Sequence, residues 1–182
     1  MQEKALEYLK RIIKAREETF LFNSVKVEML SDLDDGILNR YGLKNVKKGD
    51  TIEVPLWVAE TLENLGLGKS TEEGFEIELF RILNREKLQG QYQLSPIKSD
   101  FYLKLRRYLI NLSKNSSREA FNKMRIYAQD LITLRLNKII SLAVSTSNIG
   151  QTSSSMTPEE LVLYREVREL VTLWKRMMLG EE

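Results

Sequence analysis

The segment from Ser116 to Val144 constrains the fold more than any other part of this chain. Its apolar residues recur at spacings of three and four, which predicts an α-helix, yet they cover more than one face. A helix of this kind is usually central in a bundle, because every apolar side needs a neighbour to cover it. The apolar residues of the segment are Phe121, Met124, Tyr127, Ala128, Leu131, Ile132, Leu134, Leu136, Ile139, Ile140, Leu142 and Ala143.

Further helices are predicted on both sides of this segment, over residues 3–18, 72–88 and 99–113 and from Thr157 onward. Two of the starts carry capping signals. Ser116 with Glu119 fits a capping box, and so does Thr157 with Glu160, where Pro158 occupies the first turn. Seven of the eleven residues in 145–155 are Ser or Thr, so we expect a mobile polar loop there.

The region before the helices has the pattern of a small sheet. Residues 25–29 and 51–54 alternate apolar with polar side chains, which predicts two half-buried strands. Turn signals lie at 34–36 and 47–50. Pro55 is expected to open a short helix that Gly66 ends. The sequence therefore predicts a mainly α protein, α+β overall, with an N-terminal helix (1–20), a small β-rich domain (21–68) and a helical bundle (69–182).

Composition removes most catalytic chemistries. The chain has no cysteine and no histidine, so thiolate chemistry, disulfides and the commonest general base are absent. It contains no Walker-type phosphate loop and no Gly-x-Ser-x-Gly nucleophile turn. Asp32, Asp34 and Asp35 form the densest acidic cluster, and we interpret them as a solvated loop rather than a metal site. We expect no enzyme, no cofactor and no metal.

The charges nearly cancel, with 28 basic and 26 acidic residues, which argues against a strong field that recruits nucleic acid. A local basic patch remains an alternative, and we favour solvated helix faces for it. Its candidate members are Lys104, Arg106, Arg107, Arg118, Lys123 and Arg125.

Four other residues stand out against their surroundings. Arg135 and Lys138 lie on the apolar stripe of the central helix. Each therefore either reaches water along its stem or forms an ion pair with a neighbouring helix or another subunit. Trp57 and Trp174 are expected in the core, with anchoring of a subunit contact as the alternative.

At this point the order of motifs resembles the GINS family. Residues 25–28, 48–50 and 54–60, the last entering a helix that ends at 65–67, are similar to the small B domain of GINS subunits. Residues 100–102, 130–143 and 157–164 are similar to the helical A domain. Here the B domain comes first, as in the archaeal subunit class that merges two eukaryotic paralogues. The helix at 3–18 departs from the family pattern.

The resemblance implies a non-catalytic scaffold subunit that supports the MCM replicative helicase in DNA replication through protein–protein contacts. Its implied partners are the complementary GINS subunit in a hetero-tetramer, MCM, a RecJ-like protein and primase. DNA contact would be weak or indirect, and no membrane is involved. We expect a cytoplasmic, nucleoid-associated protein. The residues carried over or singled out as interface or structural positions are Trp57, Phe101, Tyr102, Asp130, Arg135, Lys138, Tyr164 and Trp174.

A second hypothesis from another class stays open, namely a small helical regulator that binds nucleic acid. It predicts tight DNA binding with a steep dependence on salt. A scaffold subunit instead predicts a defined hetero-oligomer with its partner. A DNA titration at two salt concentrations separates the two hypotheses.

Overall fold

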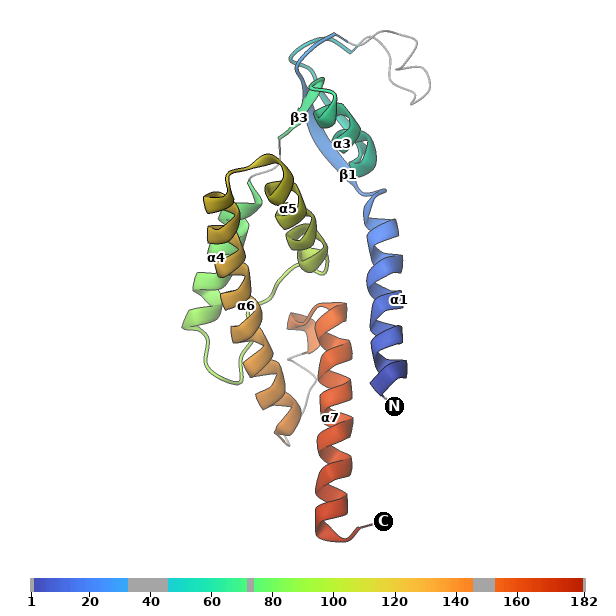
Figure 1. Cartoon of the computed structure of the whole chain (residues 1–182), viewed down its shortest axis with the longest axis vertical. Coiled ribbons are helices and arrows are strands. Elements are labelled where there is room, and N and C mark those ends of the chain that lie inside the picture. The colour runs from blue at the N-terminus through green and yellow to red at the C-terminus, as the bar shows by residue number, and fades with distance from the viewer. Residues whose placement is uncertain (1, 33–45, 72–73, 146–152, 182) are drawn as a thin grey trace. The chain divides into compact units, whose positions relative to one another are not determined.

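A computed structural model describes residues 2–32, 46–71, 74–145 and 153–181. Its helices are α1 (Gln2–Phe20), α3 (Leu56–Asn64), α4 (Phe75–Leu88), α5 (Phe101–Asn115), α6 (Arg118–Val144) and α7 (Pro158–Leu179), with a short 3₁₀ turn η3 (Ser153–Ser155). The strands are β1 (Ser24–Met29), β2 (Thr51–Pro55) and β3 (Gly68–Ser70) (Figure 1). The predicted fold class, mainly helical with a small N-terminal sheet, is confirmed. Among the described residues, no helix has the length and apolarity that crossing a membrane requires.

The chain divides into two compact units. One comprises Met1–Lys14 and Gly74–Glu182, and the other is Ala15–Glu73. The domain limits drawn from the sequence, at 20 and 68, stay predictions. The turn expected at 34–36 lies outside the described residues, together with Asp34 and Asp35.

The smaller unit is an antiparallel sheet, in the order β2-β1-β3, covered on one face by α3. Alternation along the strands decides which face is buried. Val27 and Val54 point into a core with Leu62 of α3. On the opposite face, Lys26 lies across from Glu53 in the register, and such opposite-charge pairs favour this alignment.

Two glycines are required where the chain passes from α3 to β3. Gly66 has a φ of 69°, so it takes the left-handed conformation that ends α3, as predicted. A side chain at Gly68 would bring a Cβ within 2.6 Å of Val27 Cγ1, so only glycine fits there without movement of the core. Strand β3 was not predicted, because three residues that include a glycine carry no alternating pattern.

The larger unit is a helical bundle organised around α6, which packs against α4, α5 and α7 (Figure 1). Its core has two parts along α6. The first, around the middle of α6, joins α4, α5 and α6 around Phe101 and Leu131, both fully buried. The second joins the end of α6 to α7 around Ile139 and Tyr164. The long apolar helix is therefore central in the bundle, as its pattern predicts.

Several predicted boundaries need correction. The first residue of α6 is Arg118, and the Ser117 hydroxyl accepts a hydrogen bond from the Ala120 amide. The predicted capping box of Ser116 and Glu119 is therefore wrong, because the cap is Ser117 and the residue at the third helical position is Ala120, whose side chain cannot complete a box. The capping box at Thr157 is confirmed. Pro55 ends β2 and precedes α3 rather than lying inside the helix.

The segment 145–155 was predicted to be one mobile loop. Its last three residues instead form the η3 turn, because the main chain there is held by the bundle, as described below. Residues 146–152 lie outside the described part of the chain, so the prediction for them is untested.

Candidate functional site

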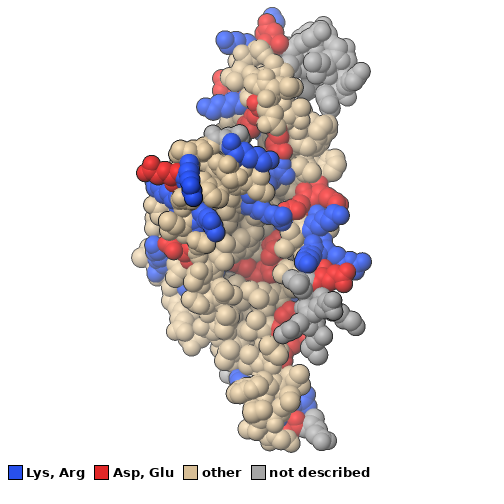
Figure 2. All heavy atoms as spheres, in the orientation of Figure 1, with Lys and Arg blue, Asp and Glu red and all other residues tan. Residues whose placement is uncertain are grey.

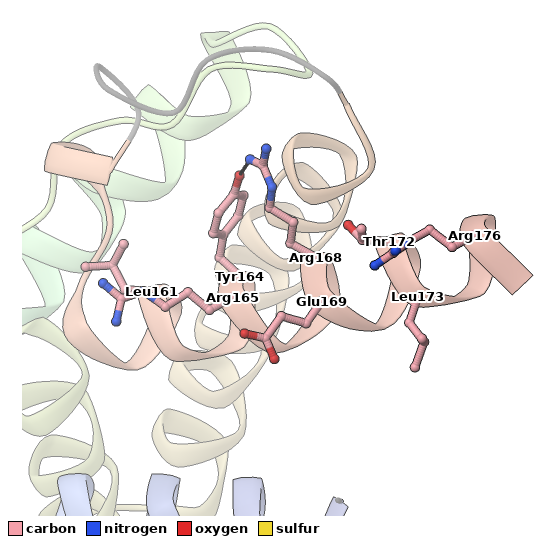
Figure 3. A pocket seen from close by; sticks show the side chains of 8 residues that line it. All are labelled: Leu161, Tyr164, Arg165, Arg168, Glu169, Thr172, Leu173 and Arg176. Carbon is pink, nitrogen blue, oxygen red and sulfur yellow. Dashed lines mark hydrogen bonds between the residues drawn. The ribbon is translucent and has the colours of Figure 1, made fainter. Parts of the chain in front are cut away.

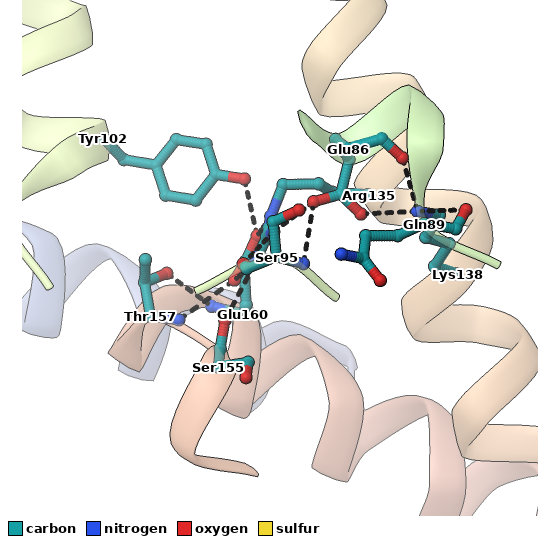
Figure 4. A network of polar contacts seen from close by, with 9 residues as sticks. All are labelled: Glu86, Gln89, Ser95, Tyr102, Arg135, Lys138, Ser155, Thr157 and Glu160. Carbon is teal, nitrogen blue, oxygen red and sulfur yellow. Dashed lines mark hydrogen bonds and ion pairs between the residues drawn. The ribbon is translucent and has the colours of Figure 1, made fainter. Parts of the chain in front are cut away.

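A network of buried charges joins the helices of the bundle, and Arg135 on α6 is its centre (Figure 4). The guanidinium is fully buried and forms an ion pair with two carboxylates. Its Nη1 lies 2.8 Å from Glu86 Oε2 on α4, while its Nε and Nη2 lie 2.6 and 2.8 Å from Glu160 Oε1 and Oε2 on α7. Two main-chain carbonyls, those of Ser95 and Ser155, accept its remaining hydrogen bonds. All five N–H groups of Arg135 are therefore used, as burial of a guanidinium requires.

Lys138, one helical turn further along α6, extends the network. Its ammonium group lies 2.8 Å from Glu86 Oε1, and it also donates to the main-chain carbonyls of Glu86 and Gln89. Glu86 is fully buried and receives hydrogen bonds from both cations and from the Ser95 amide. Two positive and two negative groups are thus buried together, and their formal charges cancel.

Glu160 connects the network to the start of α7. The same carboxylate accepts from the Thr157 amide in the capping box and from the Tyr102 hydroxyl of α5, at 2.9 and 2.7 Å. Burial raises the pKa of Tyr102, and the neighbouring charge of Glu160 raises it further. Burial by itself would lower the pKa of Arg135, but its hydrogen bonds and charge attraction to Glu160 outweigh burial and raise that pKa.

This geometry fits a structural role rather than a catalytic one. Arg135, Glu86 and Glu160 are buried, and protein atoms satisfy them. The network ties together α4, α5, α6, α7 and the connections before α5 and α7. Of the alternatives that the sequence left for Arg135 and Lys138, the structure has the ion pair with neighbouring helices.

The outer face of α6 has a different character. Five of its branched apolar side chains are between 36% and 55% exposed, although they belong to the central helix of the bundle. They recur at spacings of four to six residues along more than four turns, and Asp130 is the only exposed charged residue between the first and the last of them. This α6 stripe consists of Ile126, Ile132, Leu136, Ile140 and Val144.

The C-terminal half of α7 is also uncovered. Every residue from 172 to 180 is exposed, and in Figure 1 this part of α7 extends past the end of α6. Figure 2 shows few charged side chains over the lower part of the bundle, where the end of α6 and this half of α7 lie. Four of its apolar residues form what we name the α7 stripe, namely Leu170, Leu173, Trp174 and Met177.

A pocket runs along a side of α7 that adjoins the α7 stripe at Leu173, and its eight lining residues all belong to that helix (Figure 3). Within it, Arg168 donates a hydrogen bond to the Tyr164 hydroxyl, and its Cζ lies over the ring, 6.0 Å from the centroid. Small-molecule sites gather polar groups from several directions, and a lining from one helix does not do so. We therefore interpret this pocket as a surface groove of α7 and not as a small-molecule site.

The residues singled out from the sequence fall into three groups in the structure. Arg135, Lys138 and Tyr102 meet in the network, while Phe101 and Tyr164 are buried in the two parts of the core. Asp130 is exposed on α6. The two tryptophans do not lie in the core as expected. Trp57 on α3 is 37% exposed. Trp174 is 58% exposed, because no other described helix covers the end of α7.

Sequence reasoning missed Glu86 and the second role of Glu160. Glu86 follows Leu79, Ile82 and Leu83 at helical spacing, so it lies on the buried stripe of α4, and that position was the available signal. Glu160 was recognised only as part of the capping box. The candidate basic residues Arg118, Lys123 and Arg125 are exposed on α6, whereas Lys104 on α5 pairs with Asp100, the residue just before that helix.

The fold and the site together define a class of protein, namely a helical-bundle subunit that is preceded in the sequence by a small sheet unit. Its bundle has a buried network of paired charges, and apolar faces of two of its helices are uncovered. A family model described as the GINS complex protein helical bundle domain, of the Sld5 type, matches residues 72–179, more than half of the chain. The chain belongs to the GINS family, whose members are generally not catalysts and act in the replicative helicase complex. The search of curated proteins finds no match.

Proposed function

We propose that this chain is a non-catalytic scaffold subunit of a GINS assembly of the archaeal type, with the B domain (21–68) before the A domain (69–182). Its direct partner is the complementary GINS subunit, in a hetero-tetramer. Through that assembly it supports the MCM helicase together with a RecJ-like protein and primase, in the nucleoid-associated replisome of the cytoplasm. Support comes from the family match and from the surface of α6.

The α6 stripe carries the proposal. Isolated apolar residues are common on protein surfaces, but a contiguous row along the central helix of a bundle marks a place where another protein packs. Helices with apolar residues at such spacings bind other helices by mutual burial of these faces. The row lacks the lysines and arginines that a surface for phosphate groups would carry, which favours protein over nucleic acid as the occupant.

The test compares a position in the stripe with one on another helix. Leu136 belongs to the stripe, whereas Asn111 is exposed on α5. Leu136→Glu should weaken binding of the complementary subunit at least about tenfold, because the new carboxylate would be buried in the contact. Asn111→Glu adds the same charge outside the stripe and should change binding less than about threefold.

Binding constants for the three proteins can be measured by titration calorimetry, with circular dichroism confirming that both variants are folded. Equal binding by all three proteins would show that the stripe is not the contact. A chain that ignores the complementary subunit but binds duplex DNA with a steep salt dependence would favour the nucleic-acid regulator instead.

A further inference from the structure

Positive charge is concentrated in one part of a chain that is nearly neutral as a whole. Residues 101–129, which comprise α5 and the first part of α6, contain seven basic residues and one acidic residue. The rest of the chain contains 21 basic and 25 acidic residues. In Figure 2 lysine and arginine side chains gather over the upper part of the bundle, where α5 ends and α6 begins. Like charges held close together repel each other, so this surface attracts an anion of high charge.

The exposed face of α6 changes its chemistry along the helix. Its later part carries the α6 stripe from Ile132 onward. Its earlier part lies in line with those residues but is polar, because four exposed side chains there fall within about 60° of each other, at about 100° per residue. We name these four residues the α6 basic row, which consists of Arg118, Asn122, Arg125 and Gln129.

The α6 basic row has the chemistry of a phosphate-binding surface. Each of its side chains donates hydrogen bonds, and none carries a negative charge. Arginine, asparagine and glutamine are among the side chains that contact DNA phosphates. Arg118 and Arg125 are seven positions apart, about 10 Å along the helix axis, so each can contact a different phosphate. Neither guanidinium has an ion pair or a hydrogen bond with another residue that the structure describes.

The end of α5 adds a third cation beside the row. Lys114 is exposed in the last turn of α5, and three residues of the chain separate it from Arg118. Lys123 is also exposed, but Glu119 lies one turn before it on α6, so these two charges offset each other. Lys114, Arg118 and Arg125 therefore supply the positive charge that is available to a ligand.

Two observations favour duplex DNA over other acidic ligands. A contact with another protein has an apolar centre with aromatic or aliphatic anchors, and the α6 basic row contains no apolar residue. Single-stranded nucleic acid is held by bases that stack on exposed aromatic rings. Among the described side chains of α5 and α6, no aromatic one is exposed. The surface offers charge and hydrogen-bond donors, which are what a duplex backbone requires.

We infer that the α6 basic row and Lys114 bind the phosphate backbone of duplex DNA without reading its sequence. The inference goes beyond the proposed function, because it gives the same subunit a second surface with a different kind of ligand. The α6 stripe contacts protein, and the row before it on the same helix contacts nucleic acid.

Fluorescence anisotropy of a labelled duplex of about 30 base pairs measures this binding on the full-length chain. The affinity should be micromolar or weaker, and two duplexes of unrelated sequence should bind within about twofold of each other. Three contacted phosphates give a slope of about −2.7 for the logarithm of the binding constant against that of the salt concentration. Affinity should therefore fall about 40-fold between about 50 and 200 mM salt. Absence of binding at the lower salt concentration would overturn the inference.

A double variant then assigns the binding to the row. Arg118→Gln with Arg125→Gln removes two of the three cations, so the slope should shrink to about −0.9. The matched control is Arg85→Gln with Lys87→Gln. Both of its residues are exposed on α4 and flank Glu86, toward the other end of α6, so the slope should stay unchanged. Circular dichroism shows whether both double variants are folded. An unchanged slope in the first variant, or an equal loss in the control, would contradict a site at the row.

Binding of the complementary subunit provides the remaining readout. The variant Arg118→Gln with Arg125→Gln should bind that subunit as the original chain does. If it loses the subunit and keeps DNA, the row belongs to the subunit contact and the inference is overturned. Failure of the original chain to bind the subunit contradicts the proposed function alone, whereas failure to bind the duplex contradicts this inference alone.

Discussion

Replacing Arg135 with methionine tests the ionic core of the bundle. Methionine keeps much of the aliphatic volume but removes the charge and all five donors. Glu86 would keep Lys138 and the Ser95 amide, whereas Glu160 would keep only the Tyr102 hydroxyl and its capping contact. The buried group would change from neutral to one net negative charge. Removal of one partner from a buried ion pair typically costs about 3–5 kcal/mol of unfolding free energy.

Urea unfolding followed by circular dichroism measures this cost. The control is Arg125→Met, an exposed arginine of the same helix, which should change the unfolding free energy by about 0.5 kcal/mol or less. The double variant Arg135→Met with Glu160→Gln restores neutrality, so it should be more stable than the single variant by at least about 1 kcal/mol. If Arg135→Met costs about 1 kcal/mol or less, as for an exposed ion pair, the network does not hold the bundle together.

Three further predictions concern other parts of the fold. Because the pKa of Tyr102 is raised in the folded chain, the folded state keeps its proton above pH about 10 while the unfolded state loses it. Stability should therefore fall there by up to about 1.4 kcal/mol per pH unit, and Tyr102→Phe should reduce this slope in urea melts. Gly68→Ala places a methyl group against Val27, so it should lower the unfolding free energy of the smaller unit by about 1–3 kcal/mol, measured by Trp fluorescence. At Gly90 a methyl group would meet no atom, so Gly90→Ala should leave the unfolding free energy unchanged. Ser117→Ala should lower the thermal stability of the bundle by about 1 kcal/mol, because the α6 cap is lost. An unchanged stability would contradict Ser117 as the cap of α6.

The sequence was informative wherever one residue pattern decides a local structure. The alternation in 25–29 and 51–54 correctly predicted β1 and β2, because the buried face of a sheet takes apolar side chains and the exposed face takes polar ones. The capping box at Thr157 placed the start of α7 to the residue, because its two hydrogen bonds are local. The apolar residues on more than one face of α6 predicted its central position in the bundle.

Pairings between distant segments could not be predicted in the same way. Glu86 and Arg135 are 49 positions apart, and nothing near either residue specifies the other. The tryptophans were expected in the core from their residue type and their positions on predicted helices, but their exposure depends on which other helices pack against them. The sequence showed that α6 has more apolar residues than one buried face needs. Only the packing of α4, α5 and α7 shows which of these residues remain uncovered and form the α6 stripe.

The mass of the chain in solution, alone and mixed with the complementary GINS subunit, tests the central claim most directly. Multi-angle light scattering should show that the mixture forms one defined species well above the 21.2 kDa of a single chain. That result would mean that the uncovered face of α6 is a site of subunit contact. A monomer of unchanged mass in the mixture would contradict the account.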